Sequence, residues 1–297
     1  MRKVVIIAGP TCCGKTNYSI EYIKNCDAKI INGDSLQVYR DLKILTAFPV
    51  EYELHDIEHQ LFGFLESSEK ITAYDWAILA AHEIDDAFKE NKIPVIVGGT
   101  GFFINTLING VSMMPVISPE IRHNSKILAK NNYDTLCQYV YGHDRRLKEV
   151  IPKSKHRQMI RAYEIMISTG KSILYFHDGP KTEFIRDVFF DFNIIIPNRQ
   201  LLYNRINDRV DWMLENGAIE EVRDLLSRIN SANIDSYPVF GAIGAREIAA
   251  YLGEILPRNE MIDLIKLKTR HYAKRQITWF KHQVHESEFL KIRLLES

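Results

Sequence analysis

The sequence has few cysteines, no long apolar run and no excess of charge of either sign. Its four cysteines are Cys12, Cys13, Cys26 and Cys137, and they show no paired metal-type spacing, which argues against a disulfide framework or a zinc site. No stretch approaches the roughly 18 apolar residues that a membrane span needs. The apolar run Val4–Ala8 is too short for the core of a signal peptide. We therefore expect a cytoplasmic protein without membrane contact.

The balance of charge argues against a general nucleic-acid coat but allows a local basic face. Lys plus Arg and Asp plus Glu number 38 each in 297 residues. Positive charge is nevertheless concentrated in residues 143–171 and in residues 266–281, where aromatic side chains are interleaved. Such segregation favours contact with a polyanion, although most charged runs are solvated surfaces.

Strand and helix patterns alternate in the first third of the chain. Continuous β-branched or apolar runs predict buried parallel strands at residues 3–8, 29–32 and 93–97. Helices are expected between them, at residues 15–24 and 72–89. Such alternation indicates a parallel sheet with helices on both faces.

The second half of the chain is predominantly helical in pattern. Residues 120–169 are helical and basic, residues 188–196 predict a fourth strand, and everything after about Arg199 reads as helical. Breaks within that last part are expected at Gly241, Gly244 and Pro257.

The strongest local signal is an eight-residue phosphate-binding pattern, G-x-x-x-x-G-K-[ST], placed between a predicted strand and a predicted helix. Its residues are Gly9, Pro10, Thr11, Cys12, Cys13, Gly14, Lys15 and Thr16. The N–H groups of such a loop and the following helix N-terminus favour an anion. Lys15 adds a positive charge, and the Thr16 hydroxyl can hold Mg²⁺. The pattern specifies a phosphate chain, so a diphosphate suits it as well as ATP.

These signals predict the fold class and the division of the chain. We expect an α/β fold with a P-loop NTPase-like parallel sheet core and a helical insertion domain. The core comprises residues 1–112 and 185–297, and residues 113–184 form the insert. The boundaries follow from the change of pattern alone.

Two other segments offer polar groups where predicted strands end. Asp34 follows the second strand, where it could be a general base, a Mg²⁺ ligand or a helix N-cap. Thr100 lies in the glycine turn Gly98–Gly101, whose backbone can approach a ligand closely. Arg205 and Arg209 share one face of a predicted helix, which suits phosphate oxygens or, alternatively, surface ion pairs.

Taken in order, these motifs resemble those of the tRNA dimethylallyltransferase (isopentenyltransferase) family over nearly the whole chain. The matching segments are Gly9–Thr16, Asp34–Tyr39, Pro94–Gly101, Arg161–Glu164, Arg205–Val222 and Lys274–Phe280. Two departures stand out, because Cys12-Cys13 replace Ala-Ser and Phe48 replaces a lysine. A thiol beside an anion-binding loop is expected to have a lowered pKa, unless the cysteines serve only as small residues.

The resemblance implies an activity, a cofactor and partners. The expected reaction moves a dimethylallyl group from dimethylallyl diphosphate to N6 of the adenine at tRNA position 37, next to the anticodon. The products are N6-dimethylallyladenosine and diphosphate. Mg²⁺ is the implied cofactor, the tRNA anticodon stem-loop and dimethylallyl diphosphate are the implied partners, and a monomer is expected.

The resemblance also implies roles for individual residues. Asp34 would accept a proton or hydrogen bond from the adenine amine, while Thr100 and Arg209 would hold the leaving diphosphate. The eight loop residues would bind the diphosphate, with Thr16 on Mg²⁺. The implied tRNA contacts are Asp34, Ser35, Leu36, Gln37, Gly101, His123, Ser154, Lys155, His156, Arg157, Gln158, Lys274, Arg275 and Gln276.

Three alternatives remain open from the residues alone. They are a P-loop kinase of small molecules or nucleosides, prenyl transfer to a free adenine nucleotide, and a non-catalytic RNA-binding module. The basic insert has no role in the first two, and a complete P-loop beside an aspartate has none in the third.

Overall fold

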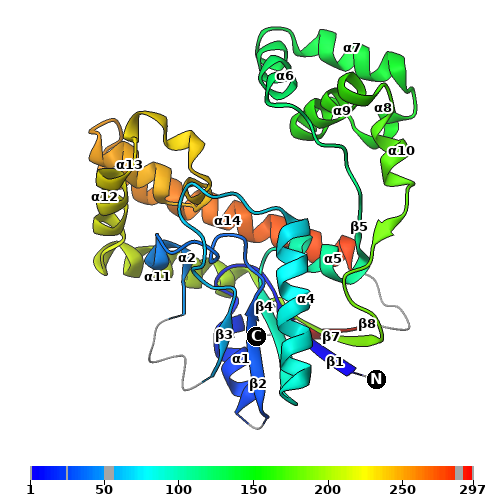
Figure 1. Ribbon diagram of the computed structural model, residues 1–297. Helices are drawn as coiled ribbons and strands as arrows, with labels where there is room; N and C mark the ends of the chain where they lie inside the picture. Colours follow the sequence, from blue (N-terminus) through cyan, green and yellow to red (C-terminus); the bar gives the residue numbers. More distant parts are fainter. Residues whose placement is uncertain (1, 25, 50–56, 285–289, 296–297) are drawn as a thin grey trace. The chain divides into compact units, whose positions relative to one another are not determined.

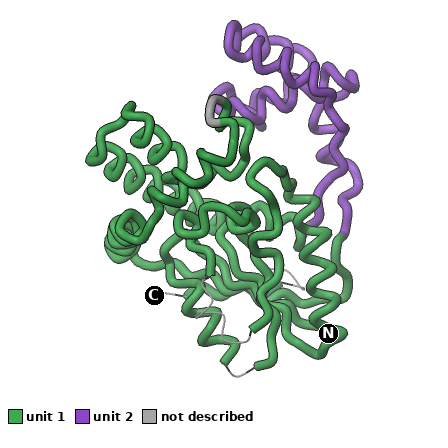
Figure 2. The backbone as a smooth tube through the Cα atoms, turned by 60° about the vertical axis from the view of Figure 1, so that its left-hand side comes forward, with its two compact units in different colours: residues 1–109, 184–297 green, residues 110–183 purple. Residues whose placement is uncertain are grey.

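The computed structural model describes residues 2–24, 26–49, 57–284 and 290–295. The chain divides into two compact units (Figure 2). Unit 1 comprises Met1–Asn109 and Phe184–Ser297, and unit 2 comprises Gly110–Glu183. Within the described part of the chain, no helix has both the length and the apolarity to cross a membrane.

Unit 1 is built on a six-stranded sheet in which every pairing is parallel (Figure 1). The strand order is β3-β2-β4-β1-β7-β8. The strands are β1 (Arg2–Ala8), β2 (Ala28–Asn32), β3 (His59–Gln60), β4 (Ile93–Gly98), β7 (Val188–Ile195) and β8 (Leu290–Leu295). The expected α/β fold with a parallel sheet is confirmed.

Both faces of the sheet are buried, which explains the continuous apolar runs of its strands. On one face, Val4 and Ile6 of β1 belong to a core with α4 (Ala73–Lys89) and α5 (Gly101–Asn109). On the other face, Val5 and Ile7 pack in a second core with Ile23 of α1 (Lys15–Ile23). Figure 1 shows α4 lying across the sheet.

One strand contradicts the prediction that everything after Arg199 is helical. Residues 290–295 form β8, which pairs with β7 at the edge of the sheet. Its apolar residues Leu290, Ile292 and Leu294 alternate with the charged Lys291 and Arg293, and Leu290 is buried whereas Leu294 is 66% exposed. This alternation is typical of a half-buried strand, but it extends over only six residues, and the segment is completed as a strand by pairing with β7.

The remaining helices of unit 1 pack around the segment that follows β2. They are α2 (Lys43–Thr46), α11 (Arg199–Glu215), α12 (Ala218–Arg228), α13 (Ala245–Leu252) and α14 (Arg258–Gln283), with 3₁₀ turns at Ser231–Ser236 and Pro238–Gly241. Their core includes Val38 and Leu42 from the segment after β2. The expected breaks are confirmed, since a 3₁₀ turn ends at Gly241, Gly244 precedes α13 and Pro257 precedes α14.

Unit 2 is helical and has its own core. Its elements are β5 (Val111–Ser112), α6 (Pro119–Asn131), α7 (Tyr133–His143), α8 (Leu147–Val150), α9 (His156–Thr169), α10 (Ile173–His177) and β6 (Lys181–Thr182). Leu136, Val140, Met159 and Ile165 are buried together. β5 and β6 form a two-stranded antiparallel ribbon.

Candidate active site

Loops from three neighbouring strands meet at the carboxyl edge of the sheet. The register aligns Ala8 of β1 with Gly98 of β4, and Asn32 of β2 with Val97. The loops after β1, β2 and β4 therefore begin side by side, where open parallel sheets bind ligands. These loops carry the phosphate-binding pattern, Asp34 and Thr100.

The loops after β2 and β4 touch through their backbones. The N–H of Thr100 donates to the carbonyl oxygen of Gly33 over 3.2 Å. A Cβ placed on Gly98 would lie 2.1 Å from the carbonyl carbon of Gly33. Glycine at position 98 is therefore required by this close approach.

The phosphate-binding loop, Gly9–Thr16, has the backbone shape that its sequence predicts. Gly14 has φ 92° immediately before α1, and Cys12 also lies in the left-handed region, with φ 61°. A Cβ on Gly9 would meet the carbonyl oxygen of Ile195 at 2.5 Å. The Lys15 ammonium reaches back to the carbonyl oxygen of Pro10, 3.4 Å away. The loop therefore closes over the Lys15 ammonium, and its backbone N–H groups can bind an anion.

Burial of Cys12 corrects the expectation of a reactive thiol. Burial raises the pKa of the Cys12 thiol, and the positive charges of Lys15 and Arg209 offset this only in part. Cys12 packs against apolar residues of α11 and α14, including Ile206 and Ala273. The desolvation of a thiolate therefore outweighs the favourable charges. Cys12 is partly exposed, whereas Cys13 is buried, at 1% exposure.

The carboxylate of Asp34 has two differently placed oxygens. Its Oδ1 accepts a hydrogen bond from the N–H of Leu36 over 3.0 Å, which closes a local turn. Its Oδ2 faces the turn after β4, since a Cβ on Gly99 would lie 3.6 Å from it. No helix begins at this turn, so the N-cap alternative does not describe Asp34. Oδ1 therefore stabilises the turn after β2, while Oδ2 is directed at the turn after β4.

Thr100 is joined to the same segment by its side chain. The N–H of Ser35 donates to Thr100 Oγ1 over 2.9 Å, and the Thr100 hydroxyl donates to Ser35 Oγ over 3.2 Å. The structure therefore brings Asp34, Ser35 and Thr100 together, as the motifs suggested.

Gln37 is anchored by its amide group. Its Nε2 donates to the carbonyl oxygens of Thr46 and Ala47, over 2.9 and 2.8 Å. Leu36 lies beside Gly241, since a Cβ added to Gly241 would lie 3.6 Å from Leu36 Cδ2. Because both donors of Gln37 are used in this way, its carbonyl Oε1 is the group suited to contact a base.

Two arginines from α11 approach the phosphate-binding loop. Arg205 Nη1 donates to the carbonyl oxygen of Cys13 over 3.2 Å. Arg209 Nη2 donates to the carbonyl oxygen of Ile44 over 2.7 Å, and its guanidinium lies 4.5 Å from the centre of the Trp212 ring. The charge of Arg209 also acts on Cys12. These contacts place Arg205 beside the phosphate-binding loop and Arg209 beside Ile44, and phosphate binding by the pair stays a prediction.

Helix α14 supplies two side chains that hold the loops together. The buried amide of Gln276 accepts from the N–H of Thr11 over 2.9 Å and donates to the carbonyl oxygen of Gly99 over 2.8 Å. One turn later, the Trp279 ring fills the space beside Gly101, where a Cβ would lie 2.1 Å from it. The sequence motif that contains Gln276 therefore joins the phosphate-binding loop to the turn after β4.

Comparison with known proteins identifies the family of the chain. The IPP transferase family model matches residues 37–283 of the chain. The chain belongs to the tRNA dimethylallyltransferase (IPP transferase) family. The tRNA dimethylallyltransferase of Zymomonas mobilis is 39% identical over 285 residues, which are 96% of this chain and 89% of that protein. That of Rickettsia bellii is 35% identical over 286 residues, with coverages of 96% and 90%.

Solved structures agree with this membership. A tRNA isopentenylpyrophosphate transferase from Staphylococcus epidermidis has 28% identity and a TM-score of 0.66, covering 100% of this chain and 93% of its own. A eukaryotic dimethylallyltransferase acting on tRNA has 27% identity and a TM-score of 0.77, with coverages of 100% and 74%. Membership of this family favours a dimethylallyltransferase over the two alternatives of a P-loop kinase and a non-catalytic RNA-binding module.

The residues expected to contact tRNA differ in their exposure. Lys274 and Arg275 are exposed on α14, whereas Gln276 is only 5% exposed and Gly101 is buried. Gln276 is held between the loops by its two hydrogen bonds, and its contact with tRNA, like that of Gly101, stays a prediction. The other expected contacts in unit 1, at residues 34–37, are partly buried.

The expected contacts in unit 2 are all at its surface. These residues are His123, Ser154, Lys155, His156, Arg157 and Gln158. The ring of His156, the first residue of α9, stacks on Tyr133 with centroids 4.2 Å apart. An exposed segment with lysine, histidine and arginine suits a polyanion, and its contact with tRNA stays a prediction.

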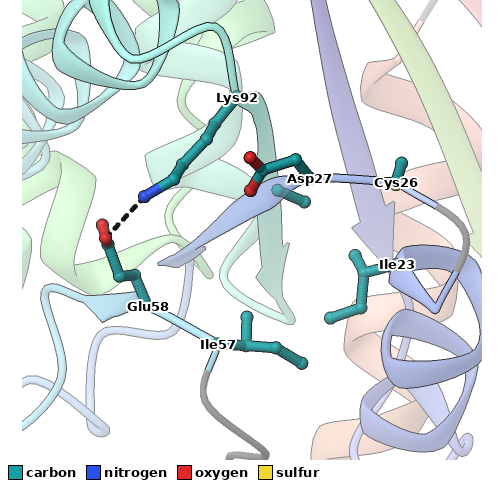
Figure 3. A pocket seen from close by; sticks show the side chains of 7 residues that line it. Ile23, Cys26, Asp27, Ile57, Glu58 and Lys92 are labelled. Carbon is teal, nitrogen blue, oxygen red and sulfur yellow. Dashed lines mark hydrogen bonds and ion pairs between the residues drawn. The ribbon is translucent and has the colours of Figure 1, made fainter.

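A small cavity of about 120 Å³ lies elsewhere in unit 1 (Figure 3). Its lining includes Asp27 and Lys92, which precede β2 and β4. The ammonium of Lys92 is paired with Glu58 over 2.6 Å. Because these residues lie at the amino ends of the strands, the cavity is on the opposite edge from the phosphate-binding loop.

Proposed function

We propose that the carboxyl edge of the sheet transfers a dimethylallyl group from dimethylallyl diphosphate to N6 of adenine 37 in tRNA. The observation that carries the proposal is the meeting of Asp34, Thr100 and the phosphate-binding loop at one edge of the sheet in a member of this family. The products are N6-dimethylallyladenosine and diphosphate. The enzyme is taken to act as a cytoplasmic monomer on the tRNA anticodon stem-loop.

The phosphate-binding loop is assigned to the diphosphate. Negative charge develops on this group as the bond to the dimethylallyl carbon breaks, so donors fixed beside it stabilise the transition state. Lys15 and Arg209 supply positive charge there, and the charges of both act on the Cys12 thiol of the same loop. Thr100 supplies a hydroxyl from the neighbouring loop. Removing one such donor typically costs about 10²–10³ in rate.

The first turn of α1 suits a magnesium ion bound with the diphosphate. Thr16 offers a hydroxyl oxygen, the kind of ligand that Mg²⁺ prefers. No cluster of three metal-binding side chains occurs among the described residues, which fits an ion held largely by the phosphate oxygens of the substrate. When bound, Mg²⁺ would neutralise charge on the departing diphosphate.

Asp34 is assigned to the adenine amine. The exocyclic amine is a poor nucleophile, so it needs alignment and an acceptor for its proton. Oδ2 is the oxygen for this role, because Oδ1 is engaged with the N–H of Leu36. Gln37 Oε1 and Ser35 lie on the same segment and can contact the edge of an extruded base. A loop nucleotide costs less to unstack than a paired one.

The direct test is incubation with dimethylallyl diphosphate and Mg²⁺, with either tRNA or AMP as acceptor. Mass spectrometry of digested RNA should show dimethylallyladenosine with tRNA and no prenylated nucleotide with AMP. ATP should not be required. Prenylation of AMP alone would support transfer to a free nucleotide, and ATP-dependent phosphorylation without prenylation would exclude the proposed reaction.

A further inference from the structure

Helix α2 is a single turn with a left-handed residue at each end. Leu42, which precedes it, has φ 59°, and Ala47, which follows it, has φ 55°. For residues other than glycine this conformation is strained, and it persists only where the surroundings hold it. Leu42 also has no polar side chain with which to bond the N–H groups of the first turn. The contacts that hold α2 in place therefore have to come from other elements.

Glu221 of α12 supplies the partners at the N-terminal end of α2. Its Oε1 accepts from the N–H of Ile44 over 3.0 Å, and its Oε2 accepts from the N–H groups of Ile44 and Leu45 over 3.2 and 3.3 Å. A Cβ on Gly217, at the start of α12, would lie 3.4 Å from Ile44 Cδ1. The side chain of Glu221 thus fixes this turn of backbone against α12.

The carbonyl groups of the same turn bind two side chains of the candidate active site. Arg209 Nη2 donates to the carbonyl oxygen of Ile44 over 2.7 Å. Gln37 Nε2 donates to the carbonyl oxygens of Thr46 and Ala47 over 2.9 and 2.8 Å. A displacement of α2 would therefore move the hydrogen-bond partners of Arg209 and Gln37 together.

We propose that Glu221 is a positioning residue, which holds α2 where it keeps Arg209 at the diphosphate and Gln37 at the adenine. The inference rests on the proposed function, in which these two side chains contact different substrates. Glu221 contacts neither substrate on this assignment, and its carboxylate acts through the backbone of α2. Because one turn serves both side chains, loss of these hydrogen bonds should weaken the binding of both substrates.

The test compares Glu221→Asp with Glu221→Gln. Aspartate keeps the charge but is one methylene too short for the N–H groups of Ile44 and Leu45, so Kd for dimethylallyl diphosphate with Mg²⁺ and Kd for tRNA should each rise about fivefold. Glutamine keeps the length and one oxygen that can accept from both N–H groups, so both Kd values should stay within about twofold of wild type. The matched control is Glu220→Asp, at the neighbouring exposed glutamate that pairs with Arg223, and it should change neither value.

A double variant identifies the route by which Glu221 acts. In a Gln37→Ala background, Glu221→Asp should no longer change Kd for tRNA, because the side chain that α2 positions is already absent. Kd for dimethylallyl diphosphate should still rise about fivefold in that background, because Arg209 is retained. A general loss of structure would instead weaken the binding of both substrates in either background.

The outcomes separate this inference from the proposed function. A wild type that binds both substrates and makes no dimethylallyladenosine refutes the proposed reaction, whereas the Kd values test Glu221 independently. Unchanged Kd values in Glu221→Asp, or a loss in Glu221→Gln that equals that in Glu221→Asp, overturn the positioning role. The folded fraction of each variant is measured by thermal unfolding, and wild-type Kd values after correction for that fraction also overturn it.

Discussion

Replacing Gln276 by alanine should weaken both the fold and the diphosphate site. The buried amide makes two hydrogen bonds, one to Thr11 and one to Gly99. Truncation leaves a backbone N–H and a carbonyl without partners, and each such group costs about 1–3 kcal/mol. Because water can enter the vacated space, we expect the free energy of unfolding to fall by about 2–4 kcal/mol. At roughly 2–4 °C per kcal/mol, Tm should fall by about 4–16 °C.

The assay combines thermal unfolding with two binding titrations. Kd for dimethylallyl diphosphate should rise about tenfold, equivalent to about 1.4 kcal/mol, because Thr11 is no longer held in place. Kd for tRNA should change little. Thr278→Ala, on the exposed side of the same helix, is the control and should leave all three values unchanged. An unchanged Tm with weakened tRNA binding would refute the positioning role and restore a direct RNA contact.

Four further outcomes are expected. Lys15→Ala should weaken dimethylallyl diphosphate binding in calorimetry, because the loop loses its positive charge; unchanged binding would place the diphosphate elsewhere. Asp34→Asn should lower the transfer rate by about 10²–10⁴ with tRNA affinity within a few-fold, and near-normal turnover would refute the base assignment. Charge reversal at Lys274 and Arg275 should reduce tRNA affinity and its salt dependence in filter binding. Iodoacetamide should inactivate slowly at pH 7 and faster at higher pH, since the raised pKa of the Cys12 thiol leaves little thiolate; rapid inactivation at pH 7 would contradict this.

The sheet core could be predicted because its signals are local. A strand buried on both faces reads as a continuous apolar run, so β1, β2 and β4 were found within one residue at each end. The phosphate-binding loop, Asp34 and Thr100 follow these strands directly. Since the carboxyl ends of parallel strands share one edge, their meeting could be expected from sequence order alone.

Two errors have a different physical origin. The edge strand β8 depends on pairing with β7, which lies about a hundred residues earlier in the chain. The pKa of the Cys12 thiol depends on how deeply the side chain is buried, and the neighbouring sequence gives only the charges. The positive charges of Lys15 and Arg209 lower the pKa, but their effect is smaller than that of desolvation.

The motif Lys274–Phe280 of α14 shows why a sequence motif alone does not indicate what each of its residues contacts. Lys274, Arg275 and Gln276 are consecutive, and the family resemblance implies that all three contact tRNA. Consecutive residues of a helix are separated by about 100° and do not share a face. The cations are exposed, whereas Gln276 reaches Thr11, 265 residues away in the chain. Contacts of that separation leave no periodic pattern, so the same short motif can carry an exposed charged surface and a buried link between the phosphate-binding loop and the turn after β4.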